Sequence, residues 1–402
     1  MRRSTDRILT THAGSLPRPT DLREMWSKRA SGAQDEALLQ ERLQSAVGEV
    51  VLSQLKGGVN IPNDGEFGKP MRAASDRSAW SSYIFERVSG FGATPQDAVA
   101  PGRTEQGAPM RIVAVRWEQR EFAEFYADSA LGALSAAATR PMCIGPITYT
   151  GHEALRHDLA NLKTAAAAAG VEEAFVSSIA PGSLEVFCRA QNSHYPTAGA
   201  FLAAIAAALR EEYRAIVDAG FLLQLDDPGL PDAWDMLDPR PSVEQYRRYA
   251  LLRVEALNGA LVDIPEDRVR HHNCWGSWHG PHTTDIPLRE IVGVMLQVKV
   301  QAYAVESGNV RHEHEYKVWR DVKLPVGKLL IPGVVSHATN VVEHPELVAD
   351  RILAFADIVG RENVIAGTDC GLGGRVHPQI AWAKLRALSE GAALAGEKLW
   401  GA

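Results

Sequence analysis

Short apolar segments alternate with longer amphipathic segments along most of these 402 residues. The apolar segments have the length and composition of buried strands, and most are followed by a segment whose apolar residues repeat with helical spacing. Strands that alternate with helices pair in parallel through right-handed crossovers, so the sequence predicts an α/β fold. The strand candidates are residues 7–13, 59–62, 142–148, 174–179, 221–225, 268–273, 302–305, 328–335 and 363–366.

Polar residues that can do chemistry stand at the carboxyl end of nearly every strand candidate. A (β/α)₈ barrel gathers these ends at one mouth, whereas an open doubly wound sheet spreads them along an edge. We therefore expect an α/β protein with a (β/α)₈ TIM barrel, a single decorated unit over residues 1–402 with insertions in its strand-to-helix loops. Length and composition alone do not separate one barrel from two domains. The residues at strand ends are Ser15, Glu66, Asp226, His272, Cys274, Glu306 and Cys370.

Two segments do not fit a simple barrel. Residues 69–140 lose the alternation, and we interpret them as a long excursion with a β-like run at 110–117. Nine strand candidates also compete for the eight places of the barrel. We expect the segment 174–179 to lie outside it.

The bulk properties exclude several function classes. The formal net charge is -7 and there is no basic tract, so we expect no nucleic-acid partner. Apolar stretches are too short to cross a bilayer, and the first residues lack the apolar core of a secretory signal, so we expect a cytoplasmic protein without membrane contact. Four cysteines are too few for a disulfide framework, which leaves thiolate chemistry open.

A zinc site is the main chemical prediction. His272 and Cys274 are two residues apart on one strand, so their side chains leave on the same face. Glu306 follows one helix-plus-strand unit later, and Cys370 follows two units after that. Each residue alone is explained by ordinary burial, but four such residues at strand ends predict Zn²⁺ bound by His272, Cys274, Glu306 and Cys370.

Other histidines in the same part of the chain compete for the metal, and we interpret residues 311–315 as a solvated loop whose charges compensate one another. The competing histidines are His271, His279, His282, His312 and His314.

Two thiolates, one carboxylate and one imidazole leave excess negative charge on the metal. Such a zinc ion is a poor Lewis acid for water but suits an incoming thiol, so we predict a thiol alkyltransferase. Glu66 and Asp226 are predicted to hold the ammonium of an amino-acid thiol. Backbone N–H groups and the hydroxyl at Gly14 and Ser15 would hold its carboxylate. A sulfonate thiol would instead need a cation, and Arg18 or Arg311 could provide it.

Several motifs resemble the catalytic barrel of the cobalamin-independent methionine synthase family. They are HAGSLPRP, NDGEF, LQLDDPGL, HHNCWG, AYAVES and VIAGTDCG, in this order, and the resemblance runs from about Ile8 to Leu388. The chain resembles a short, core-only relative, because it has no counterpart of the N-terminal half of full-length members. The resemblance implies zinc at the four predicted ligands, methyl transfer to homocysteine or a related thiol, and thiol contacts from Ser15, Glu66 and Asp226. It also suggests that 174–179 is an insertion.

Departures from the family pattern leave the partners open. The family has a catalytic histidine after a Gly-Val strand, and the nearest histidine, His337, lies about one position early. The aromatic segment that stacks a folate donor is poorly matched at residues 143–149. Epoxyalkane:coenzyme M transferase is similar to the same barrel and opens an epoxide with a zinc-bound thiolate. A non-catalytic zinc- or thiol-binding protein is a further alternative, and a metal-independent decarboxylase barrel would give the two cysteines no role.

Overall fold

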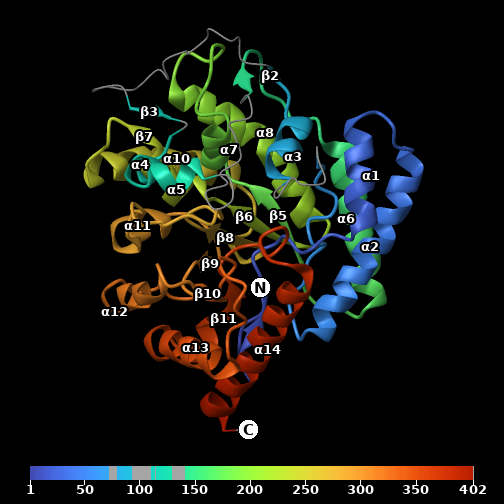
Figure 1. The fold of residues 1–402 in the computed structure, drawn as a ribbon, viewed down its shortest axis with the longest axis vertical. Coiled ribbons are helices and arrows are strands. Elements are labelled where there is room, and N and C mark those ends of the chain that lie inside the picture. Colours follow the sequence, from blue (N-terminus) through green and yellow to red (C-terminus); the bar gives the residue numbers. More distant parts are fainter. Residues whose placement is uncertain (72–78, 93–109, 114, 129–140, 402) are drawn as a thin grey trace.

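The computed structural model describes residues 1–71, 79–92, 110–113, 115–128 and 141–401. Its centre is a parallel sheet of seven strands in the order β1-β11-β10-β9-β8-β6-β5, and helices surround this sheet (Figure 1). The sheet curls into a half-barrel of the TIM-barrel-like type. Its strands are β1 (Leu9–Thr10), β5 (Phe175–Ile179), β6 (Leu222–Asp226), β8 (Val269–Asn273), β9 (Ala302–Val305), β10 (Leu329–Val335) and β11 (Ile365–Thr368).

The predicted strand at 59–62 connects the two edges of the curled sheet without forming a regular strand. The backbone N–H groups of Asn60 and Ile61 donate to the carbonyl oxygen of Thr10 in β1, at 3.0 and 3.1 Å. On the other side, the N–H of Phe175 in β5 donates to the carbonyl oxygen of Pro62 at 3.0 Å. The segment therefore satisfies backbone groups on both edge strands.

The expectation that 174–179 lies outside the sheet is wrong, and so is its reading as an insertion. β5 pairs with β6 in continuous parallel register from Phe175–Leu222 to Ile179–Asp226, and all five of its residues are buried. The segment that lies outside is 142–148, where β4 (Met142–Cys143) pairs antiparallel with β2 (Phe91–Gly92). Pro146 explains the difference, because proline lacks the N–H group that a central strand must donate.

The main helices lie where the apolar spacing of the sequence predicts them, at about residues 35–56, 154–169, 198–219, 243–257, 288–298, 345–358 and 378–394. They are α2 (Glu36–Lys56), α6 (His152–Ala168), α8 (Ala198–Asp218), α10 (Val243–Ala260), α11 (Leu288–Met295), α13 (Pro345–Val359) and α14 (Pro378–Trp400). Two of their starts have clear causes, since Asp35 caps α2 and Ser242 forms a capping box with Gln245 at α10. Among the described residues, no helix combines the length and apolar character that crossing a bilayer requires.

Shorter elements complete the described chain. They are α1 (Thr20–Ala30), α3 (Trp80–Arg87), α4 (Trp117–Glu121), α5 (Ala123–Ala127), α7 (Pro181–Phe187), α9 (Gly229–Asp232), α12 (Val318–Asp321), β3 (Arg111–Ile112), β7 (Leu237–Asp238) and 3₁₀ turns at Ala233–Met236, Glu266–Arg268, Glu313–Lys317 and Arg361–Asn363.

Part of the predicted excursion at 69–140 lies outside the described residues, and the rest packs onto the barrel. The β-like run at 110–117 is confirmed only as β3, which pairs antiparallel with β7, while α4 begins at Trp117. Glu212 of α8 anchors α3 and the segment just before α6, since it accepts hydrogen bonds from the hydroxyls of Tyr83 and Tyr149. A buried carboxylate with several such donors fixes these segments beside the sheet.

Candidate active site

A cluster of one histidine and two cysteines lies at the carboxyl ends of the sheet. Ligating atoms of His272, Cys274 and Cys370 all lie within 4.8 Å of one another, and the two sulfurs are 3.9 Å apart. His272 is the penultimate residue of β8, Cys274 follows the strand by one residue, and Cys370 follows β11. Neither ring nitrogen of His272 has a hydrogen-bond partner within the described residues, although the side chain is buried. An unpartnered buried imidazole beside two sulfurs fits a metal ligand.

Glu306, the fourth predicted ligand, follows β9 but is not part of this tight cluster. One of its carboxylate oxygens accepts from the Asn309 side chain at 3.2 Å, and the other, Oε1, is buried and unpaired among the described residues. Burial and the nearby negative charges of Asp369 and Cys370 raise the pKa of Glu306 well above its usual value. A bound cation would remove that penalty, so the residues fit a divalent metal, and zinc is the ion preferred by two sulfurs with one nitrogen. Glu306 as a ligand remains a prediction.

Asp369 holds the loop after Glu306 and was missed by the sequence analysis. Its Oδ1 accepts from the backbone N–H groups of Ser307 and Gly308, at 2.8 and 2.7 Å. Its Oδ2 accepts from the same Asn309 side chain that contacts Glu306, at 3.0 Å. Its position next to Cys370 could have identified it, because a carboxylate directly before a predicted ligand is well placed to orient the metal ligands.

The two cysteine sulfurs share one environment. The contact with Cys274, together with the imidazoles of His272 and His337, holds the pKa of Cys370 well below its usual value against the opposing effect of burial. A thiolate is the form that binds metals. The other two cysteines, Cys143 and Cys188, are buried elsewhere and donate to backbone carbonyls.

Three of the competing histidines make other contacts. His271 leaves β8 on the face opposite to His272, and its ring nitrogens lie 3.1 Å from Asp227 and from Asn273. His282 and His312 share the carboxylate of Asp285, at 2.9 and 3.1 Å. These rings are already paired within the protein.

The prediction of a solvated loop at 311–315 is wrong for two of its residues. His312 and Glu315 are buried and hydrogen-bonded to each other at 2.8 Å, so the charges do compensate but away from water. Arg311 is exposed and donates to the carbonyl oxygen of Thr283 at 2.8 Å. It lines neither of the cavities described below.

The stability of the fold should depend on pH through His312. Burial opposes its charged form, but hydrogen bonds and charges from Asp285 and Glu315 outweigh burial and raise the pKa of His312 to about 9. Because the folded pKa is raised above 6.5, the stabilisation is complete below about pH 6.5 and is lost as pH rises through 9. We expect His312→Asn to cost roughly 3 kcal/mol at pH 6 and much less at pH 9.5, measured by urea unfolding. A cost that is independent of pH would contradict this assignment.

Glu66 is held in a strained position at the mouth. Its φ of 63° lies in the left-handed region, which non-glycine residues rarely adopt. Ser177 of β5 donates to its Oε1 at 2.6 Å. A Cβ on Gly14, whose φ is 128°, would lie 2.5 Å from the same oxygen, so only glycine leaves room for this carboxylate. Strain that the surroundings maintain at a carboxylate in a cavity indicates a functional position.

Lys69 pairs with Glu66 and was also missed by the sequence analysis. Its Nζ lies 3.2 Å from Glu66 Oε1 and 3.4 Å from the Ser177 hydroxyl. The same ammonium lies 3.5 Å from the ring centroid of Trp80. No sequence motif marks Lys69. Its contact partner Trp80 is eleven residues later, in a part of the sequence without the alternation of strands and helices.

The remaining predicted residues lie around the same mouth. Asp226 ends β6 beside His272, accepts from the Gln224 side chain at 2.7 Å, and has its pKa raised to about 7 chiefly by burial. Ser15 accepts through its carbonyl from the N–H groups of Leu372 and Gly373, which ties its loop to the chain after Cys370. His337 is buried, and burial lowers its pKa to about 4, so the ring is uncharged at neutral pH.

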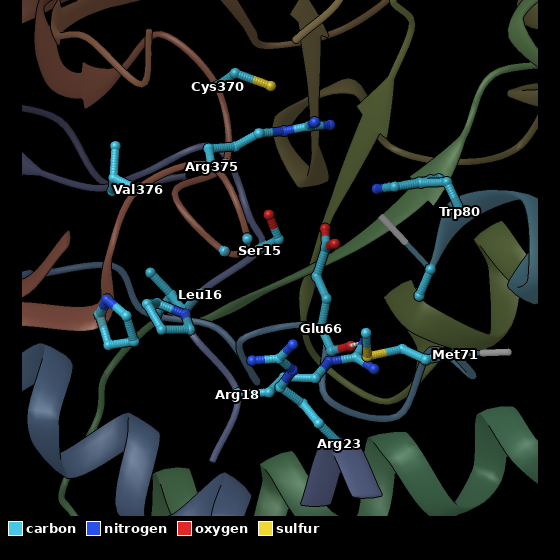
Figure 2. A pocket seen from close by; sticks show the side chains of 16 residues that line it. Ser15, Leu16, Arg18, Arg23, Glu66, Met71, Trp80, Cys370, Arg375 and Val376 are labelled. Carbon is cyan, nitrogen blue, oxygen red and sulfur yellow. Dashed lines mark hydrogen bonds between the residues drawn. The ribbon is translucent and has the colours of Figure 1, made fainter. Parts of the chain in front are cut away.

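Two adjoining cavities open beside the cluster. The first, of about 340 Å³, is lined by His272, Cys274 and Asp226 and has apolar walls that include Phe187 and Trp278. The second, of about 310 Å³, is lined by three arginines, Arg18, Arg23 and Arg375, and is called the arginine lobe below. Figure 2 shows the Glu66 carboxylate pointing into this lobe, with Arg375 above it and Arg18 and Arg23 below it in the view. The two cavities share Ser15, Glu66, Trp80, Cys370, Gly371 and Arg375.

The curled parallel sheet defines a barrel-like α/β protein. A histidine and two cysteines at the carboxyl ends of its strands form a potential metal-binding site beside a small-molecule cavity. Comparison with known families gives the particular class. Residues 197–393 match the family described as cobalamin-independent synthase, catalytic domain, so this part of the chain belongs to the cobalamin-independent synthase family.

Individual relatives are similar over most of the chain. The 2-hydroxypropyl-CoM lyase of Xanthobacter autotrophicus is 24% identical, covering 96% of this chain and 94% of that protein. The methionine synthase of Saccharolobus solfataricus is 25% identical, covering 97% and 95%. A solved B12-independent methionine synthase from Shewanella sp. W3-18-1, in complex with selenomethionine, superposes with a TM-score of 0.70 at 18% identity, covering 98% of this chain and 100% of that one. This structural likeness supports the TIM-barrel-like fold.

Proposed function

We propose that this protein is a zinc-dependent thiol alkyltransferase that, like methionine synthases, transfers a methyl or related alkyl group to homocysteine or a similar small thiol. The observation that carries the proposal is the cluster of His272, Cys274 and Cys370, whose ligating atoms lie within 4.8 Å of one another beside a cavity. Membership of residues 197–393 in the cobalamin-independent synthase family supports it. Among common metal sites, two sulfurs and one imidazole suit thiol chemistry better than water activation.

The chain's own residues would divide the work at this site. His272, Cys274 and Cys370 would hold the zinc ion, with Glu306 as a fourth donor. When bound, the ion would supply the positive charge that lowers the pKa of an incoming thiol. The apolar walls of the first cavity, which include Phe187 and Trp278, would lower the local dielectric constant around a bound thiol and strengthen its electrostatic interactions.

Orientation and proton transfer complete the proposal. Ser15, Glu66 and Asp226 would orient the thiol, since all three line the first cavity together with the cluster. His337 is uncharged at neutral pH and its Nδ1 is unpaired among the described residues. It would take up the proton that the thiol releases and pass it to the leaving group of the alkyl donor.

We also propose that segment 59–62 acts as the eighth strand of a closed (β/α)₈ barrel that spans the chain as one unit. Its backbone hydrogen bonds to both β1 and β5 support this closure.

Epoxide opening by a thiol is the second candidate. The relative named 2-hydroxypropyl-CoM lyase aligns over 96% of this chain. The arginine lobe favours it as well, because guanidinium groups are suited to a sulfonate. In this reaction the thiol sulfur would form a bond to an epoxide carbon, the carbon–oxygen bond would break, and the oxygen would take a proton to give a hydroxyalkyl thioether.

A single-turnover assay tests the proposal. Zinc-loaded protein would be mixed with a panel of thiols and with either a methylated folate or a short epoxide, and products would be identified by mass spectrometry. We expect a thioether from one donor class with the wild type, and none with Cys274→Ser. A protein that holds zinc and binds thiols, yet forms no thioether with any donor, would instead be the non-catalytic zinc- or thiol-binding alternative.

A further inference from the structure

The side chain of Asn309 connects two buried carboxyl groups beside the cluster. Its Nδ2 donates to Glu306 Oε2 at 3.2 Å and to Asp369 Oδ2 at 3.0 Å, so each carboxyl group receives one N–H of the amide. Glu306 is 3% exposed and Asp369 is 0% exposed. Within the described part of the chain, neither forms an ion pair, so their contacts are with neutral N–H donors.

The backbone fixes the orientation of this amide. Asn309 Oδ1 accepts from the N–H groups of Arg311 and His312, both at 3.0 Å. The oxygen of an amide only accepts and its nitrogen only donates, so an amide turned by 180° would lose all four contacts. The NH₂ group of Asn309 therefore faces the two carboxyl groups, and every donor and acceptor position of the amide is used.

This contact makes the two oxygens of Glu306 different. Oε2 accepts from Asn309, whereas Oε1 is buried and has no partner among the described residues. The register of the sheet places Glu306 beside the cluster, because Val305 of β9 pairs with Asn273 of β8, and Glu306 and Cys274 are the next residues. Residues in parallel register present their side chains on the same face of a sheet. A buried acceptor without a partner beside a metal-type site is suited to a bound cation.

Asp369 holds Asn309 from the other side. Its Oδ2 accepts from Asn309, and its Oδ1 accepts from the backbone N–H groups of Ser307 and Gly308, at 2.8 and 2.7 Å. Asp369 also directly precedes Cys370 in the chain. The loop after β9 and the cysteine after β11 are therefore joined through one set of hydrogen bonds. Loss of an outer contact that orients a metal ligand typically lowers metal affinity by roughly 10–100-fold.

We propose that Asn309, supported by Asp369, is a positioning residue of the metal site, because its NH₂ group occupies Oε2 of Glu306 and leaves Oε1 for a divalent cation. This inference rests on the proposed function for the location of the zinc ion. It adds a residue to the four predicted ligands, since Asn309 would act through Glu306 and not as a ligand itself.

Titration with metal alone tests this role in the full chain. Asn309→Ser keeps a side-chain oxygen that can accept from the N–H groups two and three residues later, but it removes the NH₂ group. Competition with a chromophoric chelator should show a loss of zinc affinity of about tenfold or more. With Co²⁺ in place of zinc, the variant should keep the charge-transfer absorption of the cysteine sulfurs and change its ligand-field bands, because only the oxygen ligand is disturbed.

Two further variants make the result decisive. Asp369→Asn keeps an acceptor for the backbone but turns an NH₂ group toward Asn309, so it should reproduce the loss of affinity even if Asn309→Ser does not fold. Asn258→Ser is the matched control, because the Asn258 amide also connects two backbone groups, Gln297 and Lys299, after α10. It should leave affinity and spectrum unchanged. A folded Asn309→Ser or Asp369→Asn protein with the zinc affinity and cobalt spectrum of the wild type would overturn the proposal.

The two proposals can fail separately. A wild type that binds zinc, whose affinity depends on Asn309, and that transfers no alkyl group would reject the transfer and keep the positioning role. Confirmed alkyl transfer with zinc affinity independent of Asn309 would reject only the positioning role. A wild type that binds no zinc would overturn both.

Discussion

Cys370→Ser should lose zinc and, with it, all measurable alkyl transfer. The substitution removes one of two sulfurs in a cluster that offers one nitrogen besides. Loss of residues that merely orient a ligand typically costs 10–100-fold in metal affinity, so loss of a ligand itself should cost more than about 100-fold. Inductively coupled plasma mass spectrometry after dialysis measures the metal content, and Cys274→Ser should behave in the same way.

Cys188→Ser is the matched control for this experiment. Cys188 is fully buried, even more so than Cys370, but its sulfur donates to the carbonyl oxygen of Glu185 and is not part of the cluster. The control should keep its zinc. Retention of zinc by Cys370→Ser, or its loss in Cys188→Ser, would show that the metal is bound elsewhere.

Arg270→Met should destabilise the fold by about 3 kcal/mol or more. Arg270 precedes His272 by two residues on β8, is 1% exposed, and donates to Gln224, Thr11 and the carbonyl oxygen of His12 at 2.8–2.9 Å. Methionine fills similar volume but leaves these three buried acceptors without their donor, and each such loss costs about 1–3 kcal/mol.

Urea unfolding measures this effect, and Arg268→Met provides the comparison. Arg268 lies just before the same strand but is only partly buried, and it donates to the carbonyl oxygen of Gly220. Its replacement should cost less than about 1 kcal/mol. Equal unfolding midpoints for the two variants would mean that the buried hydrogen bonds of Arg270 contribute no more to stability than the contact of Arg268.

Much of the fold could be predicted from residue periodicity. The helices at Ala198–Asp218 and Pro345–Val359 begin within a residue of their predicted starts, because their apolar spacing and capping residues are strong local signals. The choice among nine strand candidates was less local. Segment 142–148 contains Pro146, which has no N–H group to donate. That loss disfavours a central strand, which must pair with a neighbour on each side.

The candidate site could also be predicted only in part from the sequence. His272, Cys274 and Cys370 could be predicted because strand alternation and barrel geometry place strand ends together, and the structure does bring these three into one cluster. The contacts of Lys69 with Glu66 and of Asp369 with the loop after Glu306 could not, since they depend on backbone turns such as the positive φ at Glu66. Glu306 lies near the cluster but outside its tightest grouping, so its role as a ligand is a prediction for experiment.

X-ray absorption at the zinc edge tests the central claim most directly. For zinc-loaded protein without substrate, we predict scattering from two sulfurs with nitrogen or oxygen donors completing the shell. Addition of an accepted thiol should bring a third sulfur to the metal, and no third sulfur should enter in Cys274→Ser. A protein that binds no zinc, or a metal shell that contains no cysteine sulfur and ignores added thiol, would contradict the account.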